Sequence, residues 1–376
     1  MSKERFEFRS VFNEKTIFYT ASQIKSVYCD FNKEAFIAQV MEGFEILSFG
    51  DRMRKITQGL YDFLPKDFER SAHYLIQALG PPIQTQELEG YEGFYIMPMS
   101  HYIAEYGQEY YETSMQALLA MTQRFTAEFS IRTFLINNET ETLQRLHTYT
   151  QHPNCHVRRL ASEGSRPRLP LAQRLHAFVK DPTPVLALLD ALKNEPTRLV
   201  QRSIANNLND IAKDNPDRVT EFLQKWKEAK VKDVAWIINH ATRSLVKEGH
   251  KPTLRLLGFD PEIKVLKSAI NLRSSTIILG ESLNFEVQLH FENEEEEKVV
   301  IDYLLHFKKA NAETKPKVFK LTTKTIPPKA SLNLQKKHPI KFATTRAYYE
   351  GIQFIELQVN GNIIGKKVPF TLTLTH

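Results

Sequence analysis

The sequence has few of the residues on which several common kinds of site depend. Only two cysteines occur, Cys29 and Cys155, which excludes a disulfide framework and a cysteine-rich zinc module. Glycine is scarce, and the patterns GxGxxG, GxxxxGK[ST] and HExxH are absent. No apolar run approaches the roughly 18 residues of a membrane span, and the charged N-terminus lacks the apolar core of a signal peptide. We therefore expect a cytoplasmic protein without membrane attachment.

The overall composition is that of a folded chain with more than one domain. Hydrophobic residues make up 42% and charged residues 25%, which predicts a sizeable core and argues against disorder. A length of 376 residues exceeds what one core usually supports. The net charge of +6 is compatible with a polyanionic partner but is too small to demonstrate one.

The first two thirds of the chain are predicted to be helical. From Phe12 to about Leu257, apolar residues recur at helical spacing, and the interruptions are short. Proline or glycine marks each interruption. The main ones are Leu64-Pro65, Gly80-Pro81-Pro82, His152-Pro153, Asp181-Pro182 and Asn215-Pro216.

Within this helical part, similar segments recur. The pattern of residues 157–163 returns at residues 200–206, and residues 236–248 contain a third, partial copy. Such periods are typical of stacked helix pairs of the HEAT class. In the second copy, Val200 and Ile204 lie on one helical face while Arg202 and Lys213 lie on the opposite face. We expect these polar ridges to stack on one concave surface.

After Pro261 the hydrophobic period changes from 3.6 to 2. Leu283, Phe285 and Val287 alternate with polar residues, and Asn360-Gly361 is a strong hairpin signal. About seven short strands fit between Ser274 and the end, which suits an immunoglobulin-like sandwich. We predict an all-α HEAT-like repeat, an α-α superhelix, over residues 1–262, followed by an all-β sandwich over residues 263–376. A chain truncated near residue 265 is expected to keep the repeats folded.

A group of arginines and the acids near it form the candidate site. Five arginines occur between Arg158 and Arg174 with one acid, Glu163, among them. Guanidinium groups bind phosphate bidentately, although a solvated helix face explains such a run about as well. Carboxylates in a phosphate-binding surface are unusual, and the structural alternative is ion pairing with arginines one turn away. The acids in question are Glu128, Glu163 and Asp210, and the arginines considered as their partners are Arg124, Arg132 and Arg159.

Several motifs resemble the AlkC family of alkylpurine DNA glycosylases. The longest is residues 156–170, HVRRLASEGSRPRLP. The others are residues 206–214, NNLNDIAKD, Trp236-Ile237-Ile238 with His240-Ala241, and Ala127-Glu128-Phe129 with Ile131-Arg132. These motifs follow the family's order, and the resemblance spans most of residues 1–260.

The resemblance implies a DNA repair enzyme that removes N3-alkylated bases, chiefly 3-methyladenine and in related members 3-methylcytosine, without base flipping. By motif, its active-site carboxylates fall on Glu128, Glu163 and Asp210. The partner implied is double-stranded DNA with alkylated bases, bound by a monomer at the bacterial nucleoid, and no cofactor or metal is expected. The residues expected to contact DNA are Arg158, Arg159, Arg166, Arg168, Arg202, Lys213, Trp236, His240, Arg243 and Lys247.

One residue departs from the family motif. Where the family has a tryptophan that stacks against DNA at the lesion, this chain has Leu171. Leucine has no π-face for a cationic base, so Trp236 becomes a candidate platform unless the substrate range differs. The departure keeps open a second hypothesis, a non-catalytic HEAT-repeat protein that binds damaged or distorted DNA. A protein-binding scaffold is disfavoured because the ridges are rich in arginine.

Overall fold

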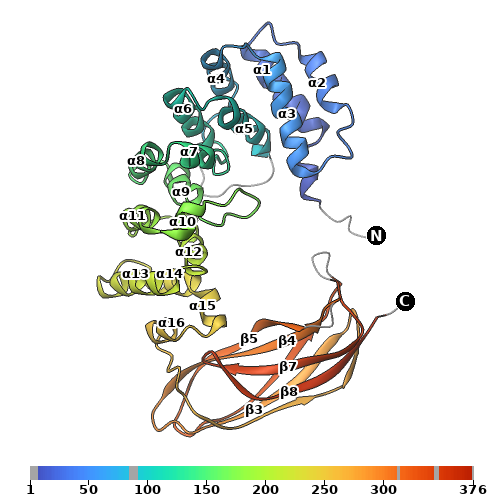
Figure 1. Cartoon of the computed structure of the whole chain (residues 1–376), viewed down its shortest axis with the longest axis vertical. Coiled ribbons are helices and arrows are strands. Elements are labelled where there is room, and N and C mark those ends of the chain that lie inside the picture. Colours follow the sequence, from blue (N-terminus) through green and yellow to red (C-terminus); the bar gives the residue numbers. More distant parts are fainter. Residues whose placement is uncertain (1–6, 84–91, 311–313, 343–346, 375–376) are drawn as a thin grey trace. The chain divides into compact units, whose positions relative to one another are not determined.

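The computed structural model describes residues 7–83, 92–310, 314–342 and 347–374. These residues form an all-helical region followed by an all-β region (Figure 1). Contacts divide the chain into two compact units, the first comprising residues 1–215 and 226–241 and the second comprising residues 216–225 and 242–376. The predicted fold class is thereby confirmed, while the domain division at residues 262 and 263 stays a prediction.

Local sequence signals set the helix boundaries. The side chains of Asn13, Ser48 and Asn154 each accept a hydrogen bond from the first turn of the helix that follows. The Leu64-Pro65 and Asn215-Pro216 interruptions fall between helices, as predicted. The helices are α1 Glu14–Val27, α2 Lys33–Met41, α3 Phe49–Phe63, α4 Phe68–Gln77, α5 Ile96–Tyr106, α6 Tyr111–Thr122, α7 Ile131–Asn137, α8 Glu139–Tyr149, α9 Cys155–Gly164, α10 His176–Lys180, α11 Thr183–Ala191, α12 Arg198–Ala212, α13 Pro216–Glu228, α14 Val234–Ala241, α15 Arg243–Glu248 and α16 Lys251–Leu256, with short 3-10 helices η1 Phe8–Val11 and η2 Glu92–Tyr95.

The repeated segments of the sequence occupy neighbouring helices. The copies at residues 157–163 and 200–206 lie in α9 and α12, and α12 packs against both α9 and α14. Val200, Ile204 and Leu208 of α12 are fully buried, as an apolar face at helical spacing requires. The repeat therefore places equivalent positions of successive helices side by side.

The sandwich pairs a three-stranded sheet, in the order β1-β3-β6, with a five-stranded sheet, in the order β2-β8-β7-β4-β5. Eight strands occur among the described residues, where about seven were expected. The missed strand is β1, whose residues are half-buried or exposed, so its hydrophobic alternation is weak. The strands are β1 Val265–Leu272, β2 Thr276–Ile278, β3 Ser282–Phe291, β4 Glu297–Lys308, β5 Thr314–Ile326, β6 Ser331–Pro339, β7 Gly351–Val359 and β8 Asn362–Thr373.

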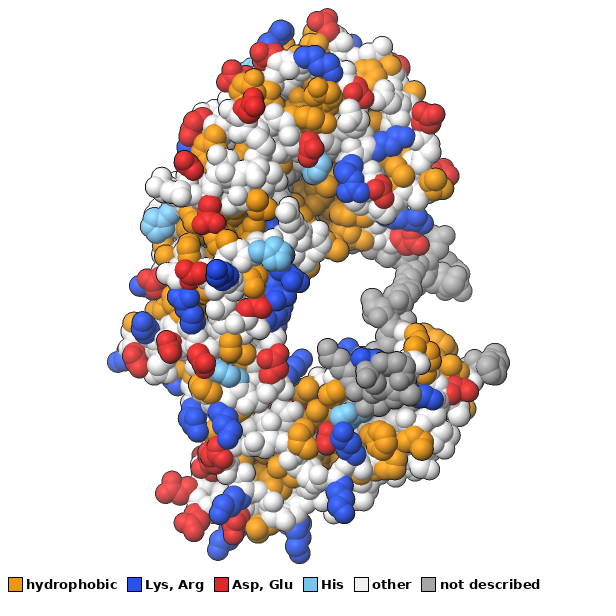
Figure 2. Space-filling view, viewed as in Figure 1, with side chains coloured by type: hydrophobic (Ala, Val, Ile, Leu, Met, Phe, Trp, Pro, Cys, Tyr) orange, Lys and Arg blue, Asp and Glu red, His pale blue; other side chains and the backbone are white. Residues whose placement is uncertain are grey.

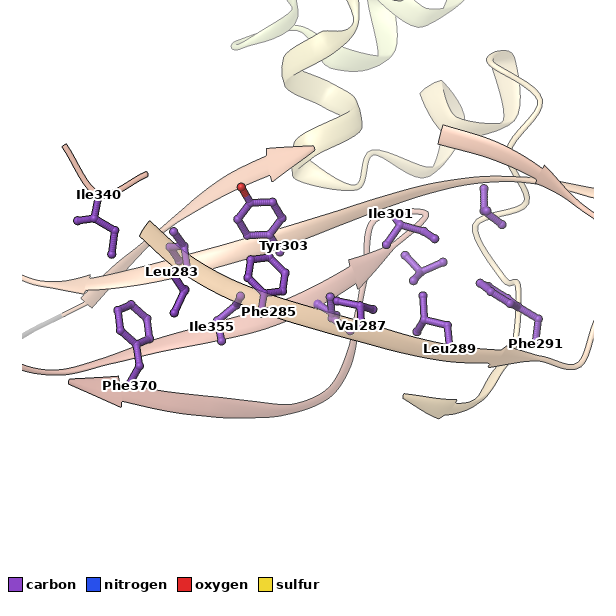
Figure 3. Close-up of a cluster of buried hydrophobic side chains, with 14 of the residues drawn as sticks. Leu283, Phe285, Val287, Leu289, Phe291, Ile301, Tyr303, Ile340, Ile355 and Phe370 are labelled. Carbon is purple, nitrogen blue, oxygen red and sulfur yellow. The ribbon is translucent and has the colours of Figure 1, made fainter. Parts of the chain in front are cut away.

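Alternate residues of β3 supply much of the sandwich core. Leu283, Phe285 and Val287 point at side chains of the other sheet, among them Ile301 and Tyr303 of β4 (Figure 3). The Asn360-Gly361 pair joins β7 to β8 with positive φ at both residues, which is the hairpin geometry that this dipeptide predicts.

The last two helices belong to the same compact unit as the sandwich. Leu254 of α16 and Phe259 pack on Val300 of β4. A close backbone contact fixes the same joint: Gly249 follows α15, Gly361 lies in the β7–β8 turn, and both have positive φ. A Cβ atom on Gly249 would lie 2.6 Å from the carbonyl oxygen of Gly361. Only glycine at both positions permits this approach.

No helix of the described residues is long and apolar enough to cross a membrane.

Candidate active site

The three candidate carboxylates lie on neighbouring elements of the first unit. Glu128 lies in the segment between α6 and α7, Glu163 on the last turn of α9, and Asp210 near the end of α12. Because α9 packs against both α6 and α12, residues far apart in the sequence meet at this level.

Two arginines connect these acids. Arg159 contacts Glu128 at 2.6 Å (Nη1 to Oε2), and its Nη2 atom lies 3.8 Å from Oε1 of Glu163. Arg166 contacts the same Glu163 oxygen at 2.6 Å and Oδ2 of Asp210 at 2.7 Å. Lys213 ends the series, 2.9 Å from Oδ1 of Asp210. We call this alternating series, Glu128, Arg159, Glu163, Arg166, Asp210 and Lys213, the ion-pair chain.

The acids in the ion-pair chain differ in how far solvent reaches them. Residue exposure is 6% for Glu163 and 2% for Asp210, whereas Glu128 is only half-buried. Burial of unpaired charges is strongly unfavourable, and in the ion-pair chain three carboxylates are matched by three cations.

Hydroxyl and amide groups from α12 fix the position of Glu163. Ser203 donates to Oε2 of Glu163 at 2.5 Å, and Asn207 donates to the carbonyl oxygen of Ser162 at 2.7 Å. On the other side, Thr126 donates to the Glu128 carboxylate. Neither Ser203 nor Thr126 was expected at the site; in the repeat Ser203 corresponds to Leu160, so the pattern gave no signal for it.

The electrostatics favour the ionised form of Glu163. Burial by itself raises the pKa of this carboxyl, but Arg159 and Arg166 together with the Ser203 hydrogen bond outweigh burial, and the net pKa is lowered. Conversely, the acids raise the pKa values of Arg159 and Arg166 against the effect of burial. All of these groups are therefore charged at neutral pH.

A buried arginine holds the loop that follows α9. Arg132, 2% exposed, donates to the carbonyl oxygens of Gly164 at 3.0 Å, Arg166 at 2.7 Å and Gln173 at 2.9 Å. Burial and the nearby Arg166 lower its pKa to about 10, which still leaves it protonated. The alternative in which Arg132 pairs with one of these carboxylates is not found among the described residues, where all three guanidinium nitrogens of Arg132 donate to carbonyl groups.

At the tip of this loop Leu171 is 79% exposed and has a φ of 64°, a conformation that leucine rarely adopts. The Arg132 hydrogen bonds on both sides of Leu171 hold it there. An apolar side chain is thus fixed outward from the loop that carries Arg166.

Several arginines expected to contact DNA are engaged inside the protein. Arg158 forms a bidentate pair with Glu195, at 2.6 and 2.9 Å, and also binds two carbonyl groups. Arg166 is 8% exposed and lies between two acids. Phosphate contacts by Arg158 and Arg166 would require these ion pairs to break, and both contacts stay predictions. Arg168 pairs with Asp214 at 2.6 Å near the surface.

Other expected DNA contacts lie along α12 and α14. Arg202 is exposed, and His240 lies 3.1 Å from Asn206. Trp236 stacks on His240 and under the Arg198 guanidinium, 4.2 Å from its ring centroid. Arg198 is twelve residues before Asp210 in α12, about 18 Å along the helix, so Trp236 is not beside the ion-pair chain. Arg243 and Lys247 belong to the second compact unit.

Lys and Arg side chains gather on one edge of the helical unit at the level of α10 and α12 (Figure 2). Within the described residues, no group of three His, Cys, Asp or Glu side chains is placed to hold a metal ion.

Comparison with known proteins adds independent findings. Residues 122–245 match the family model "DNA alkylation repair enzyme", and residues 267–374 match that of the C-terminal Ig-like domain of YhaZ. The Bacillus subtilis protein YhaZ, described as uncharacterized, is 34% identical over 358 residues, 95% of this chain and 97% of that protein. The alkylpurine DNA glycosylase AlkC of Pseudomonas fluorescens, solved with DNA containing an abasic-site analogue, is 33% identical, with a TM-score of 0.87 over 97% of this chain and 99% of that chain. With a match of this extent across both the helices and the sandwich, the chain belongs to the AlkC-like family of alkylpurine DNA glycosylases.

Proposed function

We propose that this protein is a monofunctional DNA repair glycosylase that hydrolyses the N-glycosidic bond of N3-alkylated bases in double-stranded DNA. The main substrate in this proposal is 3-methyladenine, with 3-methylcytosine as a further substrate, and each is removed without base flipping. The observation that carries the proposal is the ion-pair chain, which holds Glu128, Glu163 and Asp210 together, each in contact with a cation. Relatedness to a glycosylase solved with abasic DNA supports it.

The reaction requires the negative charge of a carboxylate more than it requires a proton donor. An N3-alkylated base already carries positive charge, so its departure requires little protonation and leaves an oxocarbenium-like sugar. A carboxylate facing that sugar stabilises the developing cation, and a second one orients the attacking water. Glu128, the most accessible of the three, is the candidate nearest to solvent water. Neutral bases leave poorly under the same conditions, which gives selectivity for cationic lesions.

In this proposal Arg159 and Arg166 are positioning residues. Each holds two carboxylates that would otherwise repel one another, so their removal should disturb the acids rather than abolish phosphate binding. DNA contacts are then assigned to the exposed or surface-paired cations Arg168, Arg202 and Lys213, and to His240 and Trp236 of α14. Arg243 and Lys247 are proposed to contribute from the second unit.

The decisive experiment is chromatography of bases released from methylated DNA by the purified protein. Release of 3-methyladenine by the wild-type chain, and its loss in Glu163→Gln and Asp210→Asn variants that still bind DNA, is the expected result. Wild-type release by both variants would reject the assignment of these carboxylates.

A second candidate function is recognition of damaged DNA without cleavage. It is favoured by Leu171, which replaces the family tryptophan and stands 79% exposed at the loop tip. Leucine can enter a distorted base step as an apolar wedge, but it offers no π-face to a cationic base. Tight binding of lesion-containing duplex with no base released over long incubation would select this alternative.

A further inference from the structure

A pocket of about 640 Å³ lies among the N-terminal helices and has no part in the site described above. The first turns of α1, the segment after α4, the start of α5 and the end of α6 form its walls. Lys15, Tyr19, Tyr95 and Arg124 supply its polar and aromatic groups. The volume falls in the range of small-molecule sites.

Arg124 is unusual among the partly buried arginines of the helical unit. Its Nε atom donates to the carbonyl oxygen of Gly80 and its Nη1 atom to that of Ala120. Among the described residues, Nη2 has neither a carbonyl nor a carboxylate acceptor. By contrast, Arg52 and Arg132 spend all three guanidinium nitrogens on carbonyl groups. Arg124 thus presents at the pocket wall a positive charge that no carboxylate among the described residues pairs with.

This charge is partly withdrawn from water. Burial lowers the pKa of Arg124, but an arginine stays protonated at neutral pH, so a partly desolvated cation remains that has no counterion within the described residues. Lys15 is exposed on the first turn of α1, and it too has no carboxylate within ion-pair distance in the described part of the chain. Two such cations at one pocket favour an anion, and phosphate matches the guanidinium fork.

The aromatic groups point to the rest of the ligand. Tyr95 is 7% exposed; its hydroxyl accepts from the Gly80 N–H at 3.3 Å, and within the described residues no acceptor takes its own proton. Tyr19 is 44% exposed and forms a T-shaped contact with Tyr95, with 4.8 Å between the ring centroids. An exposed tyrosine ring of this kind can stack on a planar group. Phosphate beside a planar ring is the chemistry of a nucleotide.

The pocket is also close to the candidate active site. Arg124 precedes Glu128 by only four residues, so the chain between them spans at most about 14 Å. Any DNA strand bound at Glu128 therefore passes near the pocket.

We propose that this pocket binds one nucleotide of a DNA strand beside the lesion, with its phosphate at Arg124 and Lys15 and its base on Tyr19. The inference rests on the proposed function, since it assumes that DNA lies along Glu128. It adds a contact that neither the arginine cluster nor the ion-pair chain provides.

The test uses the full chain and variants whose changed side chains are exposed, Lys15→Ala and Tyr19→Leu. Arg124 is left intact because it also anchors two carbonyl groups. The matched control is Lys25→Ala, which removes the same charge from the far end of α1. Fluorescence anisotropy with a labelled duplex carrying an abasic-site analogue, over a series of salt concentrations, gives the affinities and salt slopes.

We expect Tyr19→Leu to weaken duplex binding about tenfold and Lys15→Ala to lower the salt slope by about one, with Lys25→Ala like wild type. Unchanged duplex binding by both pocket variants would overturn the inference. A parallel titration with deoxyadenosine monophosphate distinguishes the source of the nucleotide: saturable binding that requires Tyr19, without any effect on duplex affinity, would also overturn it in favour of a free nucleotide. Absence of duplex binding by the wild-type chain would instead refute the proposed function itself.

Discussion

The helices and the sandwich both contain buried carboxylates, but these meet different surroundings. In the helical unit, Glu163 and Asp210 each touch a guanidinium group at less than 3 Å. In the sandwich, Asp302 on β4 is 2% exposed and has no cation within ion-pair distance among the described residues; Lys320 and Lys247 act on it only from farther away. Burial therefore dominates and raises the pKa of Asp302 to about 6.

The difference gives the two acids opposite effects on stability. Glu163 has a lowered pKa, so it stabilises the fold above its unfolded pKa of 4.5, and this contribution is lost as the pH falls through its folded pKa. Asp302 has a raised pKa, so the folded state retains the proton longer, and ionisation destabilises the fold as the pH rises from 3.8 towards about 6. Carboxylates paired with cations suit a site that must be ionised at neutral pH, whereas an unpaired buried carboxylate lowers the stability of the fold at that pH.

The largest effect is expected from Glu163→Gln. Removing this charge should lower single-turnover base release at least about tenfold, since stabilising a developing cation is a transition-state effect. It should also lower the free energy of unfolding by about 3 kcal/mol, because Arg159 and Arg166 lose a shared partner.

The matched control for this change is Glu195→Gln, which breaks a separate buried pair of the helical unit, with Arg158. It should cost comparable stability and leave base release intact once the protein is folded. Equal loss of base release in both variants would mean that Glu163 acts only through the fold.

Asp302→Asn should have the next largest effect, and of opposite sign. The raised pKa corresponds to up to about 3 kcal/mol at neutral pH, so neutralising the carboxyl should raise the free energy of unfolding by that order. The gain should disappear below about pH 4, where the native Asp302 is protonated in both states. Denaturant titrations at both pH values measure it, with Glu356→Gln, which breaks a pair with His306, as the control that should show no gain.

A smaller effect, on DNA binding, is expected from removing an exposed cation of α12. Arg202→Ala should weaken binding to DNA of any sequence and lower the salt slope by about one, because Arg202 is exposed on α12. Arg158→Ala should leave the slope unchanged and lower stability instead. A slope lowered equally by both would show that the buried pair opens when DNA binds.

The smallest effect is expected at the loop tip. Leu171→Trp restores a π-face at the position of the family tryptophan and should strengthen binding of a cationic lesion by about 0.5 to 2 kcal/mol. Comparing duplexes with 3-methyladenine and with an uncharged abasic analogue isolates that term. An equal gain on both duplexes would indicate general stacking rather than recognition of charge.

More of the fold than of the contacts within the site could be predicted from the sequence. Helical periodicity and the copies at residues 157–163 and 200–206 were sufficient to bring α9 and α12 together, and alternation at Leu283 to Val287 located the sandwich. The family motifs identified Glu128, Glu163 and Asp210 as candidate residues, and in the structure all three belong to the ion-pair chain.

Spacing along one helix could not reveal which arginines are enclosed. Arg158 pairs with Glu195, which is 37 residues away in the sequence, and Arg166 pairs with Asp210, which is 44 residues away. The use of Arg132 as a clamp on carbonyl groups depends on a loop conformation that no periodicity encodes. A guanidinium can serve phosphate, carboxylate or backbone equally well, so its role is decided by tertiary packing.

The contact between Gly249 and Gly361 bears on how this architecture can be recombined. The joint between them and the packing of Leu254 on Val300 tie α15 and α16 to the β-sheet. A chain ended near residue 265 would keep these two helices but remove the surface that covers them. The second compact unit also includes residues 216–225 of α13, where Thr220 contacts Thr253 and Asp217 contacts His250. A transplant of this sandwich onto another helical repeat would therefore need to begin near Pro216 rather than at the first strand.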